Sequence, residues 1–409
     1  MQVIYAKESF PTTATKSIFL AGPTPRDKSV PSWRPEALLR LQDLGFDGTV
    51  FVPEPRDGAW SPSGYDVQVE WEEKALKRAD CIVFWVPRDM KTMPALTTNN
   101  EWGVWCDSGK VVFGAPDNAQ AVRYQLHYAA KNKVPTSNTL NGTLDDALRM
   151  VGAGAPREGG ECEVPLHLWR NKSFQGWLQA QKKAGNRLDG CDLLWTFRVG
   201  PKKDFLFAWV AHVNVWIGKE QRNKVNEFVF GRTDVSGVVM YHRCPGDLLS
   251  SEVVVVKEFR SPARTEDGFI WEMTCGSSQN TEEGTLTVAV HEVEEEAGIK
   301  LDPKRLHKVG ARQLAGTLSV HQATVYSVEL TREEMDEVRR TAGTVRGVEA
   351  DSERTYAYVM SVGTMLRCGV GDWSTMGMVL TALADADDRD NPPRPAICLG
   401  PGFSEPFKG

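Results

Sequence analysis

The sequence has no paired cysteine motif and no long apolar run. Its eight cysteines are scattered without a Cys-x-x-Cys pair, which argues against a zinc ribbon or a dense disulfide frame and favours free thiols. No stretch approaches the roughly 20 apolar residues that span a bilayer, and residues 1–15 lack the charged start and apolar core of a signal peptide. We therefore expect a cytoplasmic protein with no membrane segment.

Positive charge is also in short supply. The formal net charge of -6 offers no basic surface to a nucleic-acid backbone, so a small-molecule substrate is expected and nucleic acid is not. The chain of 409 residues is too long for one ordinary hydrophobic core. Two domains, each with room for a site, are the natural expectation.

Short apolar runs alternate with helical patterns in the first part of the chain. The strand-like runs are residues 18–21, 50–52, 81–86 and 111–113, and helical patterns cover residues 34–44, 67–79 and 99–107. This alternation predicts an α/β domain over residues 1–155, with a Rossmann-like or flavodoxin-like parallel sheet and helices on both faces. Ligands bind such sheets at the carboxyl ends of the strands, here the loops after Leu20, Val52 and Val86.

The pattern changes twice further along. Residues 156–192 look like a helical connector, with an amphipathic stretch at 172–183. From residue 193 to 409 the sequence is rich in strand patterns and holds one long helical pattern, at about 283–297. We expect an α+β domain with a single prominent helix beside its sheet.

A run of glutamates marks that long helix. Glu292, Glu295 and Glu296 stand at i, i+3 and i+4, so on an α-helix they share one face, where like charges repel. A divalent cation would relieve the repulsion, and carboxylate oxygens suit Mg²⁺ or Mn²⁺, which bridge phosphate oxygens and activate water. One interpretation is therefore a phosphoanhydride hydrolase; the other is a solvated helix face without a ligand.

The glutamates lie in a stretch, GSSQNTEEGTLTVAVHEVEEEAGI at 276–299, that resembles the Nudix box. Counting back from Gly298 puts Glu292, Glu295 and Glu296 in register, with Glu283 at the earlier acidic position. The resemblance implies a Nudix fold, catalytic roles for Glu295 and Glu296, and metal ligation by all three glutamates of the helix.

Two positions of the box differ from the family pattern. His291 replaces the arginine that, by resemblance, orients the metal-binding glutamates, and Ser277 occupies the first glycine position, with Gly276 one residue early. A histidine lacks the fixed positive fork of arginine, so the change leaves open an active, a retuned or an inactive site.

The flank at 253–277, VVVVKEFRSPARTEDGFIWEMTCGS, is similar to one Nudix branch, the ADP-ribose pyrophosphatases. In that branch a later loop supplies a further acid, for which Glu349, as the fourth metal ligand, and Glu353 are the candidates. Arg260 and Glu272 are candidates for substrate binding. Arg260 contacts a substrate phosphate in one interpretation and forms a surface salt bridge in the other.

Unusual residues also follow the predicted strands of the first domain. SIFLAGP, residues 17–23, puts Gly22 and Pro23 just after a strand, where a residue without Cβ permits close approach of a ligand. Glu72 and Glu101 lie on successive helices, and a carboxylate pair suits glycosidic cleavage, because one can trap the oxocarbenium-like sugar while another acid assists proton transfer. Alternatively, both glutamates are solvated helix charges.

Two tryptophans lie near these carboxylates in the sequence. Trp85 and Trp102 are candidates for stacking on a base, and the alternative is that both belong to the core.

This arrangement resembles the nucleoside 2-deoxyribosyltransferase family and its nucleotide N-glycosidase relatives. The shared marks are Ala-Gly-Pro at 21–23, Glu72 before Ala-Asp at 79–80, and Glu101 before Gly103. The resemblance implies that Glu101 is the nucleophile and that Glu72 contacts the sugar. Phe19 stands where many members carry tyrosine, and the aspartate that many transferases place before the nucleophile has no clear counterpart.

Together the two motifs predict a bifunctional nucleotide enzyme. One half would cut a diphosphate such as ADP-ribose with Mg²⁺ or Mn²⁺, and the other would cut an N-glycosidic bond, with NAD as one possible substrate. The rival hypothesis is a nucleotide-sensing protein in which one or both sites bind without turnover. Both resemblances imply a homodimer.

Overall fold

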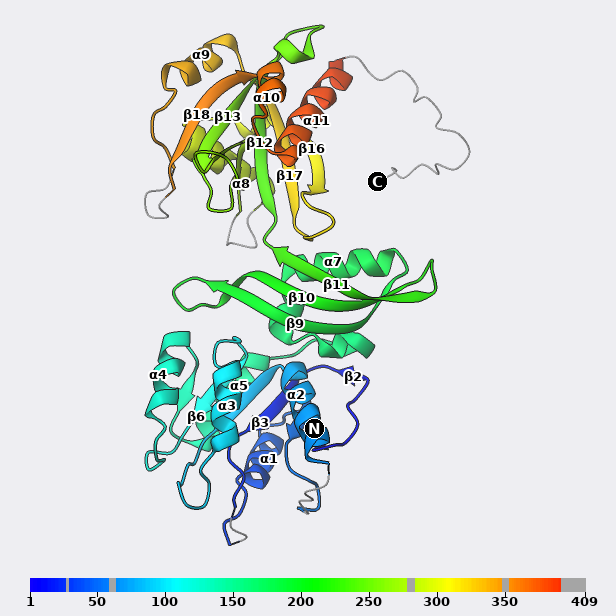
Figure 1. Cartoon of the computed structure of the whole chain (residues 1–409), viewed down its shortest axis with the longest axis vertical. Helices are drawn as coiled ribbons and strands as arrows, with labels where there is room; N and C mark the ends of the chain where they lie inside the picture. The colour runs from blue at the N-terminus through cyan, green and yellow to red at the C-terminus, as the bar shows by residue number, and fades with distance from the viewer. Residues whose placement is uncertain (27–28, 59–63, 278–283, 348–352, 391–409) are drawn as a thin grey trace. The chain divides into compact units, whose positions relative to one another are not determined.

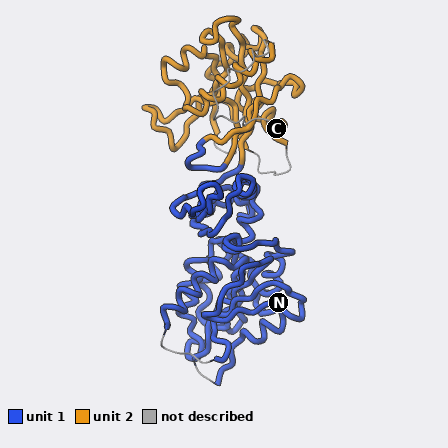
Figure 2. The backbone as a smooth tube through the Cα atoms, turned by 90° about the vertical axis from the view of Figure 1, so that its right-hand side faces the viewer, with its two compact units in different colours: residues 1–233, 315–320 blue, residues 234–314, 321–409 orange. Residues whose placement is uncertain are grey.

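The computed structural model describes residues 1–26, 29–58, 64–277, 284–347 and 353–390. The chain divides into two compact units, shown in blue and orange in Figure 2. The first comprises residues 1–233 with 315–320, and the second comprises residues 234–314 with 321–409. Among the helices of the described ranges, none combines the length and apolar character that crossing a membrane requires.

The first unit contains a six-stranded parallel sheet in the order β1-β4-β3-β5-β6-β7. Strands β3 and β6 of this sheet are labelled in Figure 1. Its strands are β1 (Gln2–Tyr5), β3 (Ser17–Ala21), β4 (Thr49–Val52), β5 (Cys81–Trp85), β6 (Val111–Gly114) and β7 (Thr136–Ser137). From β3 onward this is the flavodoxin-like order 2-1-3-4-5, with β1 added at the edge. The predicted parallel α/β architecture is confirmed.

Helices cover both faces of this sheet because successive residues of each strand point to opposite sides. The helices are α1 (Arg34–Asp43), α2 (Tyr65–Arg78), α3 (Leu96–Trp105), α4 (Arg123–Asn132) and α5 (Leu140–Val151). Phe19 and Phe84 pack with α2, α3 and α4, whereas Ile18 and Val83 pack with α1 and α5. Strand β4 is added on one side of β3, and β5 and β6 are added on the other, so the order of the strands switches between β3 and β5. The carboxyl ends of these strands therefore form the ligand-binding crevice expected of the fold.

A three-stranded antiparallel sheet completes the first unit. Its strands are β9 (Arg187–Val199), β10 (Phe205–Ile217) and β11 (Arg222–Arg232). The remaining elements of the unit are the paired strands β2 (Thr13–Ala14) and β8 (Arg157–Glu158), a 3-10 turn (Gly159–Glu163), α6 (Leu166–Trp169) and α7 (Lys172–Lys183). Phe174 and Leu178 of α7 pack against Trp209 of β10. The sequence analysis began the second domain at residue 193, whereas the structure keeps this sheet in the first unit.

The second unit is built on a seven-stranded mixed sheet, in which β14-β13-β12-β17-β16 form the main path, β15 pairs with β12 and β18 pairs with β13. The strands are β12 (Val235–His242), β13 (Glu252–Phe259), β14 (Phe269–Glu272), β15 (Thr274–Gly276), β16 (His307–Gln313), β17 (Gln322–Glu329) and β18 (Thr355–Ser361). The helices are α8 (Thr285–Glu292), α9 (Arg332–Arg340), α10 (Val362–Cys368) and α11 (Trp373–Asp390), with a π-turn at Val293–Ala297 and 3-10 turns at Leu248–Ser250 and Pro303–Arg305.

Helices flank this sheet on both faces, so the prediction of a single prominent helix was wrong. Ala289 of α8 and Met335 of α9 pack on one face, and Met365 of α10 and Val379 of α11 pack on the other. Amphipathic patterns at 332–340, 362–368 and 373–390 form three further helices, which the sequence-based prediction of a strand-rich domain did not include.

Candidate active site

A cavity of about 980 Å³ opens at the carboxyl ends of β3 and β4 in the first unit. It is lined by Gly22 and Pro23 from the loop after β3, by Glu72 of α2 and by Glu101 of α3. These four residues are far apart in the sequence, and the sheet order brings them to one place. The predicted position of the site, at the strand ends, therefore coincides with this cavity.

Gly22 is required where it lies. Its φ of 150° is strained for any other residue, and a Cβ there would overlap the carbonyl oxygen of Trp85 and come within 2.9 Å of the Trp33 ring. The chain can thus turn over the sheet at the switch point only with glycine at this position.

The two carboxylates of the cavity influence each other. Burial, followed by the negative charge of Glu72, raises the pKa of Glu101 to about 7, and the nearby Arg34 opposes the shift. Burial also raises the pKa of Glu72, while a hydrogen bond from Gln68 of 2.9 Å and the charge of Arg34 lower it. At neutral pH the pair therefore holds part of a proton, which is the state that acid–base or nucleophilic chemistry uses.

Arg34 is the residue of this site that the sequence analysis missed. Its side chain is 1% exposed and ion-paired to Glu54 at 2.6 Å. Its guanidinium also donates to the carbonyl oxygens of Leu20 and Gly22. The sequence did contain an indication of its role. A positive charge in the first turn of a helix interacts unfavourably with the helix dipole, so an arginine there indicates a compensating contact.

The two candidate stacking residues lie in the core instead. Trp85 is 7% exposed and packs on the α1 and α5 face, and Trp102 is 3% exposed and packs edge-on against Phe84. Trp85 does not line the cavity, so its prediction as a substrate-binding residue is not supported by its position. The aromatic side chains that do line the cavity are Tyr65, Trp105 and Trp195.

Residues 15–119 match a family model described as nucleoside 2-deoxyribosyltransferase like. This segment is a deoxyribosyltransferase-like domain. It contains Gly22, Glu72 and Glu101, and it ends before β9 and before the second unit. No curated protein sequence matches the chain.

Asp80, part of the Ala-Asp mark of this domain, anchors the structure. Its carboxylate is fully buried and pairs with Arg157 at 2.7 Å. It also accepts hydrogen bonds from Ser17 Oγ at 3.0 Å and from the Leu166 backbone N–H at 2.8 Å. Asp80 therefore ties β3 and the segment after residue 156 to the end of α2.

We expect Asp80→Asn to lower the free energy of unfolding by about 3–5 kcal/mol, because it leaves the buried Arg157 without its counter-ion. Urea unfolding followed by tryptophan fluorescence measures the change. Asp47→Asn is the matched control: Asp47 pairs with Lys16 but is 76% exposed, so its loss should lower the free energy of unfolding far less than the loss of Asp80. Equal losses in the two variants would contradict the anchoring role.

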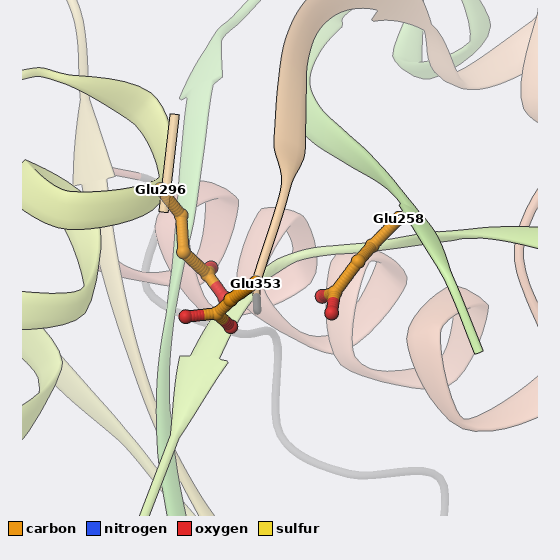
Figure 3. Close-up of side chains that lie close together, drawn as sticks. All are labelled: Glu258, Glu296 and Glu353. Carbon is orange, nitrogen blue, oxygen red and sulfur yellow. The ribbon is translucent and has the colours of Figure 1, made fainter. Parts of the chain in front are cut away.

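Carboxylates also converge in the second unit. Glu258 of β13, Glu296 of the π-turn and Glu353 before β18 each offer an oxygen within 4.8 Å of the other two. Figure 3 shows the three side chains. Burial and the neighbouring carboxylates raise the pKa of Glu296 well above its usual range, and burial raises the pKa of Glu258 to about 7. Arg260 pairs with Glu258 at 2.8 Å.

The glutamates of the predicted helix face do not all join this cluster. The α-helix ends at Glu292 and a π-turn follows, which widens the spacing on which the i, i+3, i+4 argument rested. Glu296 is buried and belongs to the cluster, whereas Glu295 is exposed and is not one of its three residues. The role of Glu295 as a metal ligand stays a prediction. Glu258, the third residue of the cluster, was not among the metal ligands predicted from the sequence.

Glu292 lies beside the cluster rather than in it. Burial, and then the charges of Glu295 and Glu353, raise its pKa to about 7. A Cβ at Gly276 would overlap the Glu292 carboxylate, so the early glycine of the motif is the one that makes room for this side chain. His291 is exposed, and Glu283 and Glu349 lie outside the described residues.

Arg260 and Glu272 are adjacent. Arg260 Nε donates to Glu272 at 2.8 Å, and its other nitrogen lies by Glu258. Arg260 therefore forms salt bridges at the edge of the carboxylate cluster, as one of its two interpretations expects.

Proposed function

We propose that the deoxyribosyltransferase-like domain cleaves or transfers the N-glycosidic bond of a nucleoside or nucleotide. The observation that carries this proposal is the pair Glu72 and Glu101 in one cavity, with the pKa of Glu101 raised to about 7. The family description of residues 15–119 supports the same chemistry.

Glu101 acts as the nucleophile in this proposal. Its carboxylate attacks C1′ of the sugar, the C1′–N bond breaks, and the bonding electrons leave with the base, which takes up a proton from solvent. Water then attacks C1′ and loses a proton, which releases the sugar and restores the carboxylate. A second base in place of water gives transfer instead of hydrolysis. Glu72 faces the sugar, and Arg34 positions the loop of Gly22 and moderates the charge of the pair.

Incubating the protein with nucleosides and nucleoside monophosphates in the presence of EDTA, and separating the products by chromatography, tests the proposal. We expect free base to appear without added metal, because the proposed mechanism uses carboxylate side chains, and no metal ion, to attack the sugar. Binding of these compounds without release of base would instead favour the nucleotide-sensing alternative.

The pH dependence provides a second test. Only ionised Glu101 can attack, so kcat/KM should rise with pH through about 7. Glu72→Gln removes a negative charge that raises the pKa of Glu101, and the rising limb should move to lower pH. Glu70→Gln, exposed on the same helix, should leave the limb in place. An unchanged limb in Glu72→Gln would contradict the coupling of the two carboxylates.

For the second unit we propose Mg²⁺- or Mn²⁺-dependent hydrolysis of a nucleoside-diphosphate-linked compound such as ADP-ribose, in a Nudix-like domain. The supporting observation is the convergence of Glu258, Glu296 and Glu353. Three carboxylates within 4.8 Å make an all-oxygen donor set, which fits a hard divalent cation. Such an ion, when bound, polarises a phosphoryl oxygen and makes a bound water more acidic.

Other residues of the second unit would assist. Glu292 lies next to the cluster, where its carboxylate can accept a proton from the attacking water, and Arg260 can pair with a phosphate oxygen. The two proposed activities would then act on one pool of nucleotides.

A further inference from the structure

Two buried side chains at or behind one part of the wall of the first unit's cavity have unsatisfied polar atoms. Both ring nitrogens of His167 are buried and have no hydrogen-bond partner in the described part of the chain. The same is true of Nε and Nη2 of Arg198, on β9. Buried donors of this kind are costly unless something binds them, most of all on a charged group.

His167 belongs to this wall, and Arg198 lies behind it without lining the cavity itself. His167 lines the cavity directly. The Arg198 guanidinium lies against Gly109, where a Cβ would overlap it, and the residues on either side of Gly109, Ser108 and Lys110, also line the cavity. The absence of a side chain at Gly109 is what lets the guanidinium approach.

The surroundings of His167 are positive. Burial holds the pKa of His167 well below its ordinary value, and the charges of Arg198, Lys110 and Arg170 lower it further. Lys110 is itself buried and donates to the backbone carbonyl oxygens of Leu76, Lys77 and Ala79, and burial lowers its pKa to about 7.

The acidic residues on this side of the cavity already have partners. Glu163 pairs with Arg78 at 2.9 Å and also accepts the Cys191 backbone N–H. Asp192 pairs with Lys77 at 2.9 Å. The charge of Asp204 acts to raise the pKa of Arg198, but the two residues form no ion pair among the described contacts. Protein carboxylates therefore do not satisfy the free nitrogens of His167 and Arg198.

We propose that His167 and Arg198 form an anion subsite of this cavity that takes a phosphoryl group of the substrate. A planar guanidinium with two free N–H groups matches phosphate oxygens, and a neutral imidazole adds one donor. The cavity of about 980 Å³ is at the upper end of the range of about 300–1,000 Å³ for small-molecule sites, which leaves room for more than a nucleoside. The inference rests on the proposed function and narrows its substrate to a nucleoside phosphate.

Binding measurements test the subsite separately from catalysis. Calorimetry on the full chain carrying Glu101→Gln compares nucleoside 5′-monophosphates, the parent nucleosides and inorganic phosphate. We expect the monophosphates to bind at least about 10-fold more tightly than the nucleosides, and a further Arg198→Gln change to remove this difference while nucleoside affinity stays within about 2-fold. Arg198→Lys, which keeps the charge but not the fork, should retain part of it.

Arg187→Gln is the matched control, because Arg187 is an exposed arginine of the same strand, paired with Asp189. It should leave all affinities unchanged. Equal affinities for monophosphate and nucleoside in the Arg198-containing protein would overturn the proposal, as would an Arg198→Gln variant that weakens both equally. Inorganic phosphate that binds through Arg198 without competing with the monophosphates would also overturn it, because the anion would then not belong to the substrate. Arg198-dependent binding without any release of base would leave the subsite standing and refute the glycosidic reaction.

Discussion

Glu101→Gln should reduce release of free base by about 10³-fold or more, because it removes the nucleophile and leaves only the binding contributions of the cavity. Gln has nearly the same size as Glu, so the packing of α3 around Trp102 should survive. The measurement is the initial rate of base release from the best substrate of the panel, at pH 8, where Glu101 of the wild type is ionised.

Two controls separate loss of chemistry from loss of structure. Glu70→Gln makes the same chemical change at an exposed position of α2 and should keep the wild-type rate. The melting temperature of Glu101→Gln at pH 8 should equal or exceed that of the wild type, since a carboxyl group with a raised pKa destabilises the fold once it ionises. A variant that retains more than about a tenth of the rate would show that another group attacks the sugar.

Glu296→Gln should abolish metal-dependent hydrolysis in the second unit, by about 10³-fold or more, and weaken Mg²⁺ binding by at least about 10-fold. Glu296 is buried and is the member of the π-turn that points into the cluster with Glu258 and Glu353. Calorimetric titration with Mg²⁺ reports binding, and formation of monophosphate from ADP-ribose reports turnover.

Neighbouring glutamates provide the comparison. Glu294→Gln, exposed and paired with Lys300, should leave both quantities unchanged. Glu353→Gln should resemble Glu296→Gln, and Glu295→Gln should have the smaller effect, because Glu295 lies outside the cluster. The sequence motif alone predicts the reverse order for Glu353 and Glu295. A severe loss in Glu295→Gln with a mild one in Glu353→Gln would contradict the placement of the metal.

The parallel sheet and its site were predictable because both depend on local patterns. Apolar runs separated by helical patterns allow few arrangements, and a parallel sheet binds ligands at its strand ends. The sequence therefore predicts that Gly22, Glu72 and Glu101 lie close together, and all three line one cavity. The same rule could not show whether Trp85 lies in the cavity or in the core. Both faces of this sheet are buried, so an apolar side chain at the end of a strand is expected in either place.

Contacts between distant segments were beyond the sequence patterns. Arg34 serves the site through the carbonyl oxygens of Leu20 and Gly22, which no motif records. The sequence predicts the strands β9–β11 but not the unit to which they belong. The packing of α7 against Trp209 of this sheet assigns them to the first unit. In the second unit, Glu258 reaches the cluster from a strand, whereas the π-turn moves Glu295 away from it.

The configuration at C1′ of the first product tests the central claim, nucleophilic attack by Glu101, most directly. With methanol added as the acceptor, the methyl glycoside formed from a β-nucleotide keeps its configuration, because it cannot mutarotate as the free sugar does, and NMR can assign it. Two successive displacements at C1′, the first by Glu101 and the second by methanol, predict a β-methyl glycoside. An α-methyl glycoside would show a single displacement by the acceptor and would contradict the role of Glu101 as nucleophile.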